Sequence, residues 1–111
     1  MTAKKDSDIG PLLSALSHPI RRQILDLLVD AGPRSATDLA EYLPISRQAV
    51  AKHIAILEEA RLVRPERCGK EVKYRIAPEP LRELGRWLAR TSTRWDRRLL
   101  ALKHAAESCQ D

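Results

Sequence analysis

The apolar residues in the first part of the chain recur at the spacing of amphipathic helices. A first short helix is predicted by Ile9, Leu12, Leu13 and Leu16, and a second by Ile20, Ile24, Leu27 and Leu28. His18 and Pro19 introduce the second helix, since a capping residue followed by proline is typical of a helix N-terminus. The second helix is predicted to end at Gly32 and Pro33.

Two further helices follow at short intervals. Ser35 has the side chain of an N-cap for a third helix over residues 36–43, with Leu39 and Leu43 facing inward. The pattern breaks at Pro44 and Ile45. Ser46 is then the predicted N-cap of a fourth helix, so that cap and helix together cover residues 46–60. Two short helices joined by so few residues form a helix-turn-helix.

The periodicity then changes from that of a helix to that of a strand. Val72, Tyr74 and Ile76 alternate with basic residues, and residues 63–66 are the predicted partner strand, with a turn over residues 67–70. A last long helix is predicted from about Pro80 to Lys103. The predicted fold is therefore mainly α (α+β), with about five helices and a two-stranded β-hairpin.

Length and composition are those of one folded domain. The chain has 111 residues, of which 43% are hydrophobic and 32% charged. No apolar run approaches the roughly 20 residues that span a bilayer, so we expect no membrane partner. Without an apolar signal segment or a cysteine framework, a cytoplasmic location is expected. We predict a disordered tail over residues 1–8, a folded domain over residues 9–104 and a C-terminal tail over residues 105–111.

The charge of the chain favours an anionic partner. Its 20 lysine and arginine residues outnumber 15 acidic ones, for a net charge of +5. Much of the excess lies at the predicted hairpin, which carries Arg61, Arg64, Arg67, Lys70, Lys73 and Arg75. A basic hairpin beside a helix-turn-helix can reach DNA phosphates or the minor groove. Lysine and arginine also protect ordinary edge strands, and both explanations can hold.

The outward face of the fourth helix has an unusual composition. Gln48 and Lys52 lie opposite the apolar Val50, Ile54 and Leu57, with alanines beside them. Small side chains permit close approach to a major groove, where glutamine pairs with adenine and arginine or lysine with guanine. The alternative is a surface helix whose alanines merely favour helicity. The candidate DNA contacts are Ser46, Arg47, Gln48, Ala49, Lys52, His53, Arg67, Lys70 and Lys73, although His53 fits a structural hydrogen bond equally well.

In order and spacing, "LSHPIRRQILDLL", "SATDLAEYLPISRQAVAKHIAILEEARLV" and "GKEVKYRI" resemble the ArsR/SmtB family of winged-helix repressors. The resemblance covers nearly the whole chain, and the last helix resembles the branch with a long terminal helix. It implies a winged helix-turn-helix in which residues 63–76 form the wing, and a homodimeric repressor of an inverted-repeat operator in double-stranded DNA. The expected dimer interface comprises Leu12, Leu13, Leu16, Leu84, Leu88, Trp95, Leu99 and Leu102.

The family's metal sites are incomplete in this sequence. Ser35 and Thr37 stand where one site needs thiols, and His104 and Glu107 match only half of the other. We therefore expect no metal, no cofactor and no catalytic residue. Two alternatives stay open: a ligand- or redox-responsive regulator of the same fold, with Cys68 as a thiol switch, and a winged-helix protein-interaction module. Nothing in the sequence identifies a small-molecule effector.

Overall fold

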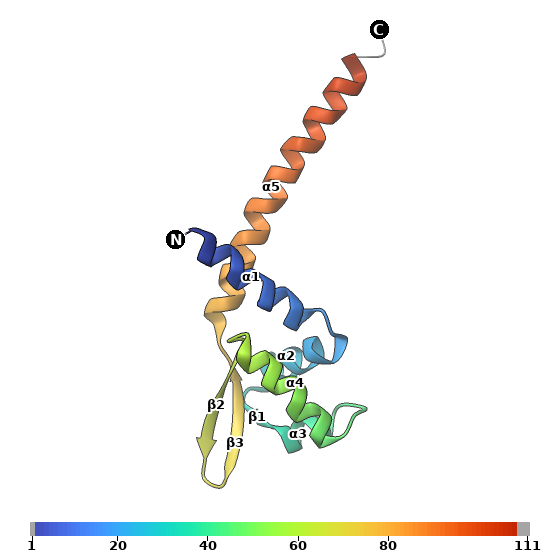
Figure 1. Ribbon diagram of the computed structural model, residues 1–111. Helices are drawn as coiled ribbons and strands as arrows, with labels where there is room; N and C mark the ends of the chain where they lie inside the picture. Colours follow the sequence, from blue (N-terminus) through green and yellow to red (C-terminus); the bar gives the residue numbers. More distant parts are fainter. Residues whose placement is uncertain (1, 109–111) are drawn as a thin grey trace. The chain divides into compact units, whose positions relative to one another are not determined.

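The structure is a computed structural model that describes residues 2–108, with side chains from residue 9 onward (Figure 1). Its elements are α1 (Thr2–Leu16), α2 (Pro19–Ala31), β1 (Arg34–Ser35), α3 (Ala36–Ala40), α4 (Arg47–Glu59), β2 (Val63–Cys68), β3 (Glu71–Ile76) and α5 (Pro78–Ser108). The predicted helices and hairpin are confirmed, and β1 is an additional strand. The chain divides into two units, residues 1–81 and 82–111, which are described separately.

Short-range hydrogen bonds begin three of the helices where the sequence predicts. His18 Nδ1 accepts a hydrogen bond from the backbone N–H of Ile20 at 3.1 Å, which places Pro19 in the first turn of α2. Ser35 Oγ accepts from Asp38 N, and Ser46 Oγ from Ala49 N, both at 3.1 Å. Each cap satisfies a backbone donor that the first helical turn leaves unpaired.

The helix ends differ from the predicted ranges. α1 begins at Thr2, within the predicted disordered tail, and α5 extends to Ser108, beyond the predicted end of the last helix at about Lys103. Alanine and lysine favour helix without an apolar stripe, so periodicity misses such extensions. α3 instead ends at Ala40, short of the predicted residue 43. The predicted domain limits stay a prediction, and Cys109 lies outside the described residues.

The three strands form an antiparallel sheet in the order β1-β3-β2. Strand β1 pairs with β3 through Arg34 opposite Tyr74 and Ser35 opposite Lys73. The sequence does not reveal this strand because two residues are too few to show alternation. The hairpin turn is also tighter than predicted, since Cys68 pairs with Glu71 and leaves two residues between the strands. Its first residue, Gly69, has a φ of +64°, as a type II′ turn requires.

The core of the first unit lies where α2, α3 and α4 meet the base of the sheet. The predicted inward faces of α3 and α4 are confirmed, since their members are at most 8% exposed: Leu39, Leu43, Val50, Ile54 and Leu57. On α2 the buried set is Ile24, Leu25 and Leu28, while Ile20 and Leu27 are only half-buried. The predicted buried face of α2 therefore lacks Leu25. This helix contacts α1, α4 and β3, so residues beyond a single stripe are buried.

The chain leaves α4 through a Schellman motif that sets the direction of the hairpin. Arg61 N donates to Glu58 O and Leu62 N donates to Leu57 O, both at 2.9 Å. Arg61 takes the left-handed position, with a φ of +64°, which glycine usually occupies. Leu62 is fully buried, and its carbonyl accepts from Ala77 N at 2.9 Å. The base of the hairpin is thereby joined to the end of α4.

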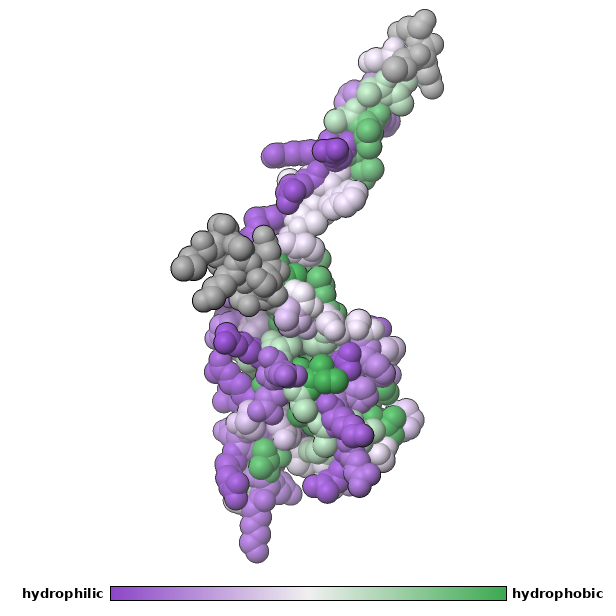
Figure 2. All heavy atoms as spheres, in the orientation of Figure 1, coloured by the Kyte–Doolittle hydropathy of each residue, from purple (hydrophilic) through white to green (hydrophobic). Residues whose placement is uncertain are grey.

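The hairpin is buried only near its base. Val63 is 1% exposed, and Tyr74 and Ile76 are half-buried. Val72, which the alternation predicts to face inward, is 37% exposed. Figure 2 shows mainly hydrophilic residues over the hairpin. The predicted alternation therefore holds at Tyr74, Arg75 and Ile76 but fails at Val72, which is exposed, and at Lys73, which is half-buried beside β1.

Candidate nucleic-acid interface

The N-terminal half of α4 presents polar side chains to solvent. Ser46, Arg47, Gln48 and Lys52 are exposed, whereas Ala49 is half-buried. The Ser46 hydroxyl already accepts a hydrogen bond from Ala49 N, so it acts as a helix cap. The nearby backbone N–H groups and the positive end of the helix dipole remain suited to a phosphate. The exposed face therefore has the composition that groove recognition needs.

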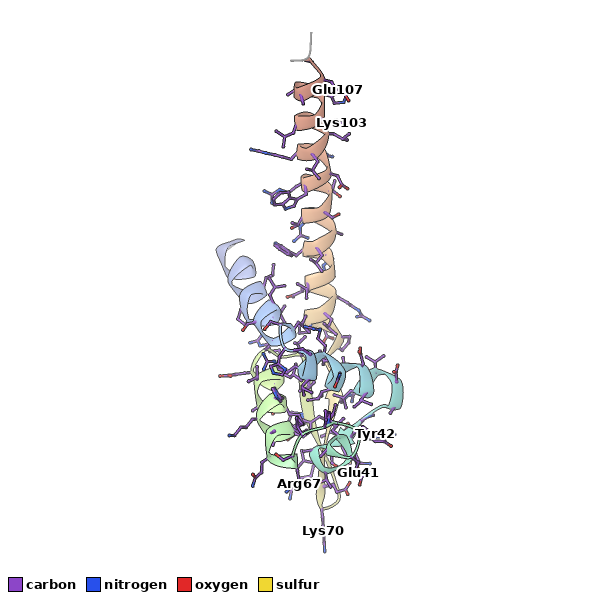
Figure 3. All side chains as sticks on the ribbon, turned by 90° about the vertical axis from the view of Figure 1, so that its right-hand side faces the viewer. Glu41, Tyr42, Arg67, Lys70, Lys103 and Glu107 are labelled. Atoms are coloured by element: carbon purple, nitrogen blue, oxygen red, sulfur yellow. The ribbon has the colours of Figure 1, made fainter. Side chains whose placement is uncertain are left out.

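Two arginines of the hairpin are paired with acids, and the basic residues near the turn are not involved in those pairs. Arg75 lies 3.8 Å from Glu66, and Arg64 lies 3.8 Å from Glu79. Arg67 and Lys70 are exposed and take part in neither pair. Figure 3 shows Lys70 at the turn, extending away from the strands, with Arg67 on the same hairpin. This end of the hairpin therefore carries positive charge available to an anion.

Lys73 occupies a different environment from Arg67 and Lys70. It lies on the central strand β3, half-buried, between Ser35 on one side and Glu66 on the other. Directly opposite it, Glu66 is the acid that lies 3.8 Å from Arg75. Lys73 remains a predicted DNA contact, but its position is less open to a phosphate than that of the two residues near the turn.

His53 lies on the flank of α4, half-buried against α2. Its Nδ1 is 3.3 Å from Nη1 of Arg21, and its ring centroid is 4.5 Å from that of His18. Burial, and then the charges of His18 and Arg21, lower the pKa of His53 below its usual value. The sequence left two roles for His53, a DNA contact and a structural hydrogen bond, and the structure contains a hydrogen bond between His53 and Arg21. A DNA contact by the same residue stays a prediction.

Two residues near this surface have no role in the sequence interpretation. Arg21 appears in the sequence only as a polar position on a helix, because its partner His53 is 32 residues away. Tyr42 is predicted within the third helix, but α3 ends at Ala40, and Tyr42 is 68% exposed in the turn before α4 (Figure 3). A phenol at this turn can donate a hydrogen bond to a phosphate.

The predicted dimer residues divide into two groups by exposure. Leu12 and Leu84 are 3% and 6% exposed and therefore buried within a single chain, and Leu16 is half-buried. The others are at least 43% exposed: Leu13 on α1, and Leu88, Trp95, Leu99 and Leu102 on α5. Figure 2 shows apolar surface along the later turns of α5. A patch of this kind marks an interaction surface.

Within residues 9–108, the structure brings together no group of three or more His, Cys, Asp or Glu side chains that could hold a metal ion. His104 and Glu107 are exposed on α5, and Thr93 Oγ1 donates to Ala89 O at 3.0 Å. Cys68 is an exposed free thiol at the end of β2. The helices of the described chain include none with an apolar stretch sufficient to cross a membrane.

Comparison with known proteins relates this geometry to regulators of transcription. A family model described as a helix-turn-helix domain matches residues 16–66. The transcriptional repressor SdpR of Bacillus subtilis is 34% identical over 77 residues, which cover 69% of this chain and 84% of the relative.

Two solved structures extend the similarity to the fold. An ArsR-like transcriptional regulator from Rhodococcus sp. RHA1 matches with a TM-score of 0.84 and 41% identity, over 97% of this chain and 98% of the other. Mb0332 from Mycobacterium bovis is described as a homodimeric winged helix-turn-helix DNA-binding domain of a possible ArsR-family regulator. It matches with a TM-score of 0.67 and 28% identity, over 88% of this chain and 87% of the other.

Proposed function

Because the chain belongs to the ArsR/SmtB family of winged-helix transcriptional regulators, we propose that it binds an inverted-repeat operator in double-stranded DNA as a homodimer and represses transcription. The observation that carries the proposal is the outward face of α4. It exposes Arg47, Gln48 and Lys52 around small residues, while the opposite face is buried. A protein-interaction module would instead expose large apolar residues over most of this face.

In the proposed complex, α4 enters the major groove. Gln48 pairs with adenine, Arg47 or Lys52 pairs with guanine, and the half-buried Ala49 lets the helix approach closely. Arg67 and Lys70 at the hairpin turn contact phosphates or the adjacent minor groove. Phosphate contacts supply most of the affinity, and contacts to base edges supply the sequence preference.

Dimerisation places two copies of α4 on one face of the DNA. The exposed leucines and Trp95 of α5 support a contact with a second copy, because this area of apolar surface is costly to leave in water. A two-fold dimer reads two half-sites about one helical turn apart, so the operator is expected to be an inverted repeat. We further propose that the protein has no enzymatic activity and that it acts in the cytoplasm, where it can reach chromosomal DNA.

The proposal is tested by measuring binding of the purified protein to its own upstream DNA and to a scrambled duplex, across a salt series. We expect tight binding to the upstream DNA and weaker, more salt-sensitive binding to the scrambled DNA. The series is repeated with added zinc and with a chelator, and neither should change the affinity. Equal, weak binding to both duplexes would contradict the proposed operator, and an effect of the chelator would return His104 and Glu107 to consideration as ligands.

A further inference from the structure

Three side chains meet where α1, α2 and α4 come together. His18 caps α2, Arg21 lies in its first turn, and His53 lies in the middle of α4. The His18 and His53 ring centroids are 4.5 Å apart with their planes at 49°, and Arg21 Nη1 is 3.3 Å from His53 Nδ1. We name this group, His18, Arg21 and His53, the histidine–arginine cluster.

Arg21 connects the end of α1 to α4. Its Nε donates to the carbonyl of Ala15 at 2.6 Å, and its Nη2 donates to the carbonyl of Ser14 at 3.2 Å. Both carbonyls lie in the last turn of α1, where helix geometry leaves them without the usual partner four residues on, and the Ser14 carbonyl also accepts from Ser17 N and Oγ. The remaining nitrogen, Nη1, reaches His53. One guanidinium on α2 therefore contacts both the end of α1 and the middle of α4.

Arg22 provides an internal comparison for Arg21. Its Nη1 donates to the carbonyl of Leu16 at 2.6 Å, so it also stabilises the end of α1. Among the residues that the structure describes, the side chain of Arg22 makes no hydrogen bond to α4, unlike that of Arg21. A substitution of Arg22 therefore removes a similar charge and a similar helix-end contact while leaving the bond to His53 in place.

The hydrogen bond from Arg21 indicates which ring nitrogen of His53 accepts. Arginine has donors only, so His53 Nδ1 must accept and its proton must be on Nε2. His18 Nδ1 likewise accepts, from the backbone N–H of Ile20. Adding a proton to the His53 ring places a hydrogen on Nδ1, which can then no longer accept from Arg21. The contact between Arg21 and His53 is therefore intact only while His53 is neutral.

The surroundings of His53 favour its neutral form, which is also the form that accepts the hydrogen bond from Arg21. Burial, then His18, then Arg21 lower its pKa, because each disfavours a positive ring. From α1 the cluster receives only backbone carbonyls. The other elements packed on α4 are α3, which carries Asp38, and β2, which carries Arg64, Glu66 and Arg67. None of these four side chains is among the causes that shift His53.

We propose that the histidine–arginine cluster positions the recognition helix α4 relative to α1, and that protonation of His53 opens it and weakens operator binding. Arg21 and His53 are then positioning residues for DNA recognition, and the protein releases its operator in acid. The inference rests on the proposed function, because DNA affinity is the output. It assigns His53 to a hydrogen bond within the protein and not to a base or phosphate.

The first test measures operator affinity from about pH 7.5 to about pH 5.5 at constant ionic strength. For the wild type we expect affinity to fall below the pKa of His53, by about tenfold per pH unit for each subunit whose His53 must be neutral, because only the neutral form holds α4 in place. In His53→Asn, the amide oxygen takes the place of Nδ1 and accepts from Arg21 without titrating. This variant should lose most of the pH dependence, because the amide does not titrate in this range.

Two variants separate the cluster from general effects of charge. Arg21→Ala should weaken operator binding and flatten the pH profile, whereas Arg22→Ala should retain the wild-type pH profile. His104→Asn changes an exposed histidine on α5 and should also retain that profile. A His53→Asn protein that keeps the full pH dependence would overturn the inference. So would one that binds weakly at every pH with an unchanged profile, because His53 would then be a DNA contact.

A second measurement requires no variant and no DNA. Nitrogen-15 NMR of the histidine side chains in the full chain reports which ring nitrogen carries the proton. We expect His53 to be the Nε2–H tautomer at neutral pH and to titrate below its usual pKa. A protonated Nδ1 at neutral pH would overturn the cluster even if operator binding is normal. Failure to bind any operator at neutral pH would instead contradict the proposed function.

Discussion

Arg61 holds a backbone conformation that is costly for any residue with a side chain. Its φ of +64° follows from the Schellman motif that ends α4 and buries Leu62 against the core. Left-handed backbone costs a non-glycine residue roughly 1–2 kcal/mol, so the surrounding hydrogen bonds must offset that cost. The packing of Leu57 and Leu62, both fully buried, imposes the conformation.

Arg61→Gly is therefore expected to raise the free energy of unfolding by about 0.5–1 kcal/mol, because glycine adopts this φ without steric strain. Urea denaturation followed by circular dichroism measures the change. The matched control is Arg61→Ala, which removes the guanidinium but keeps the strained Cβ, and should not raise stability. Equal stabilisation by both variants would mean that the arginine side chain, and not the backbone, is unfavourable at this position.

At the scale of elements, α4 and the β2–β3 hairpin have separable tasks. α4 is amphipathic, and we propose that Arg47, Gln48 and Lys52 on its exposed face read base edges. We assign Arg67 and Lys70, near the turn of the hairpin, mainly to phosphates. Substitutions in the two elements should therefore differ in what they change: sequence preference for the helix, and affinity for any duplex for the hairpin.

Gln48→Ala should weaken binding to the operator by about 1–3 kcal/mol and relax the preference at one base pair, since a bidentate contact to adenine is lost. Fluorescence anisotropy against a set of single-base operator variants measures both effects. Gln23→Ala replaces an exposed glutamine of α2 and should bind like the wild type. An unchanged preference at every position would remove Gln48 from base recognition.

Lys70→Ala should weaken binding to the operator and to scrambled DNA alike, because Lys70 is assigned to a phosphate. The slope of log affinity against log salt should become shallower by about one unit. Lys103→Ala removes an equally exposed lysine from α5 and should leave the slope unchanged. A loss confined to the operator would show that Lys70 reads a base.

At the scale of the whole molecule, we expect the exposed apolar residues of α5 to be covered by a second copy of the chain. Leu88, Trp95, Leu99 and Leu102 recur on one face of the helix and are 49% to 63% exposed. The same chain keeps Leu12 and Leu84 buried, so these two residues contribute to the fold of the single chain. Association of two copies is the arrangement that covers the exposed set and supplies two recognition helices.

Leu99→Asp should yield monomers, because it places a charge within the apolar stripe that a second copy would cover. Light scattering gives the mass, and circular dichroism verifies that the variant is folded. Ala101→Asp introduces the same charge on the same helix, off the stripe and also exposed, and should remain dimeric. A Leu99→Asp variant that is folded and dimeric would place the interface elsewhere on the chain.

Much of the fold and of the candidate DNA surface follows from the sequence because the determining interactions are local. The caps at His18, Ser35 and Ser46 act within three residues. The faces of α3 and α4 follow from helical spacing, which also identifies Gln48 as outward-facing. Spacing and residue type are sufficient to predict an interaction when both residues lie within one or two turns of the same helix.

Tertiary structure decided the features whose partners are distant along the chain. The bond from Arg21 to His53, the pairing of β1 with β3 and the burial of Leu25 depend on which elements pack together. The exposure of Val72 and the strained φ of Arg61 depend on where that packing stops or forces the chain to turn. The periodicity of the sequence cannot predict such contacts, because they form only when separate elements assemble around a common core.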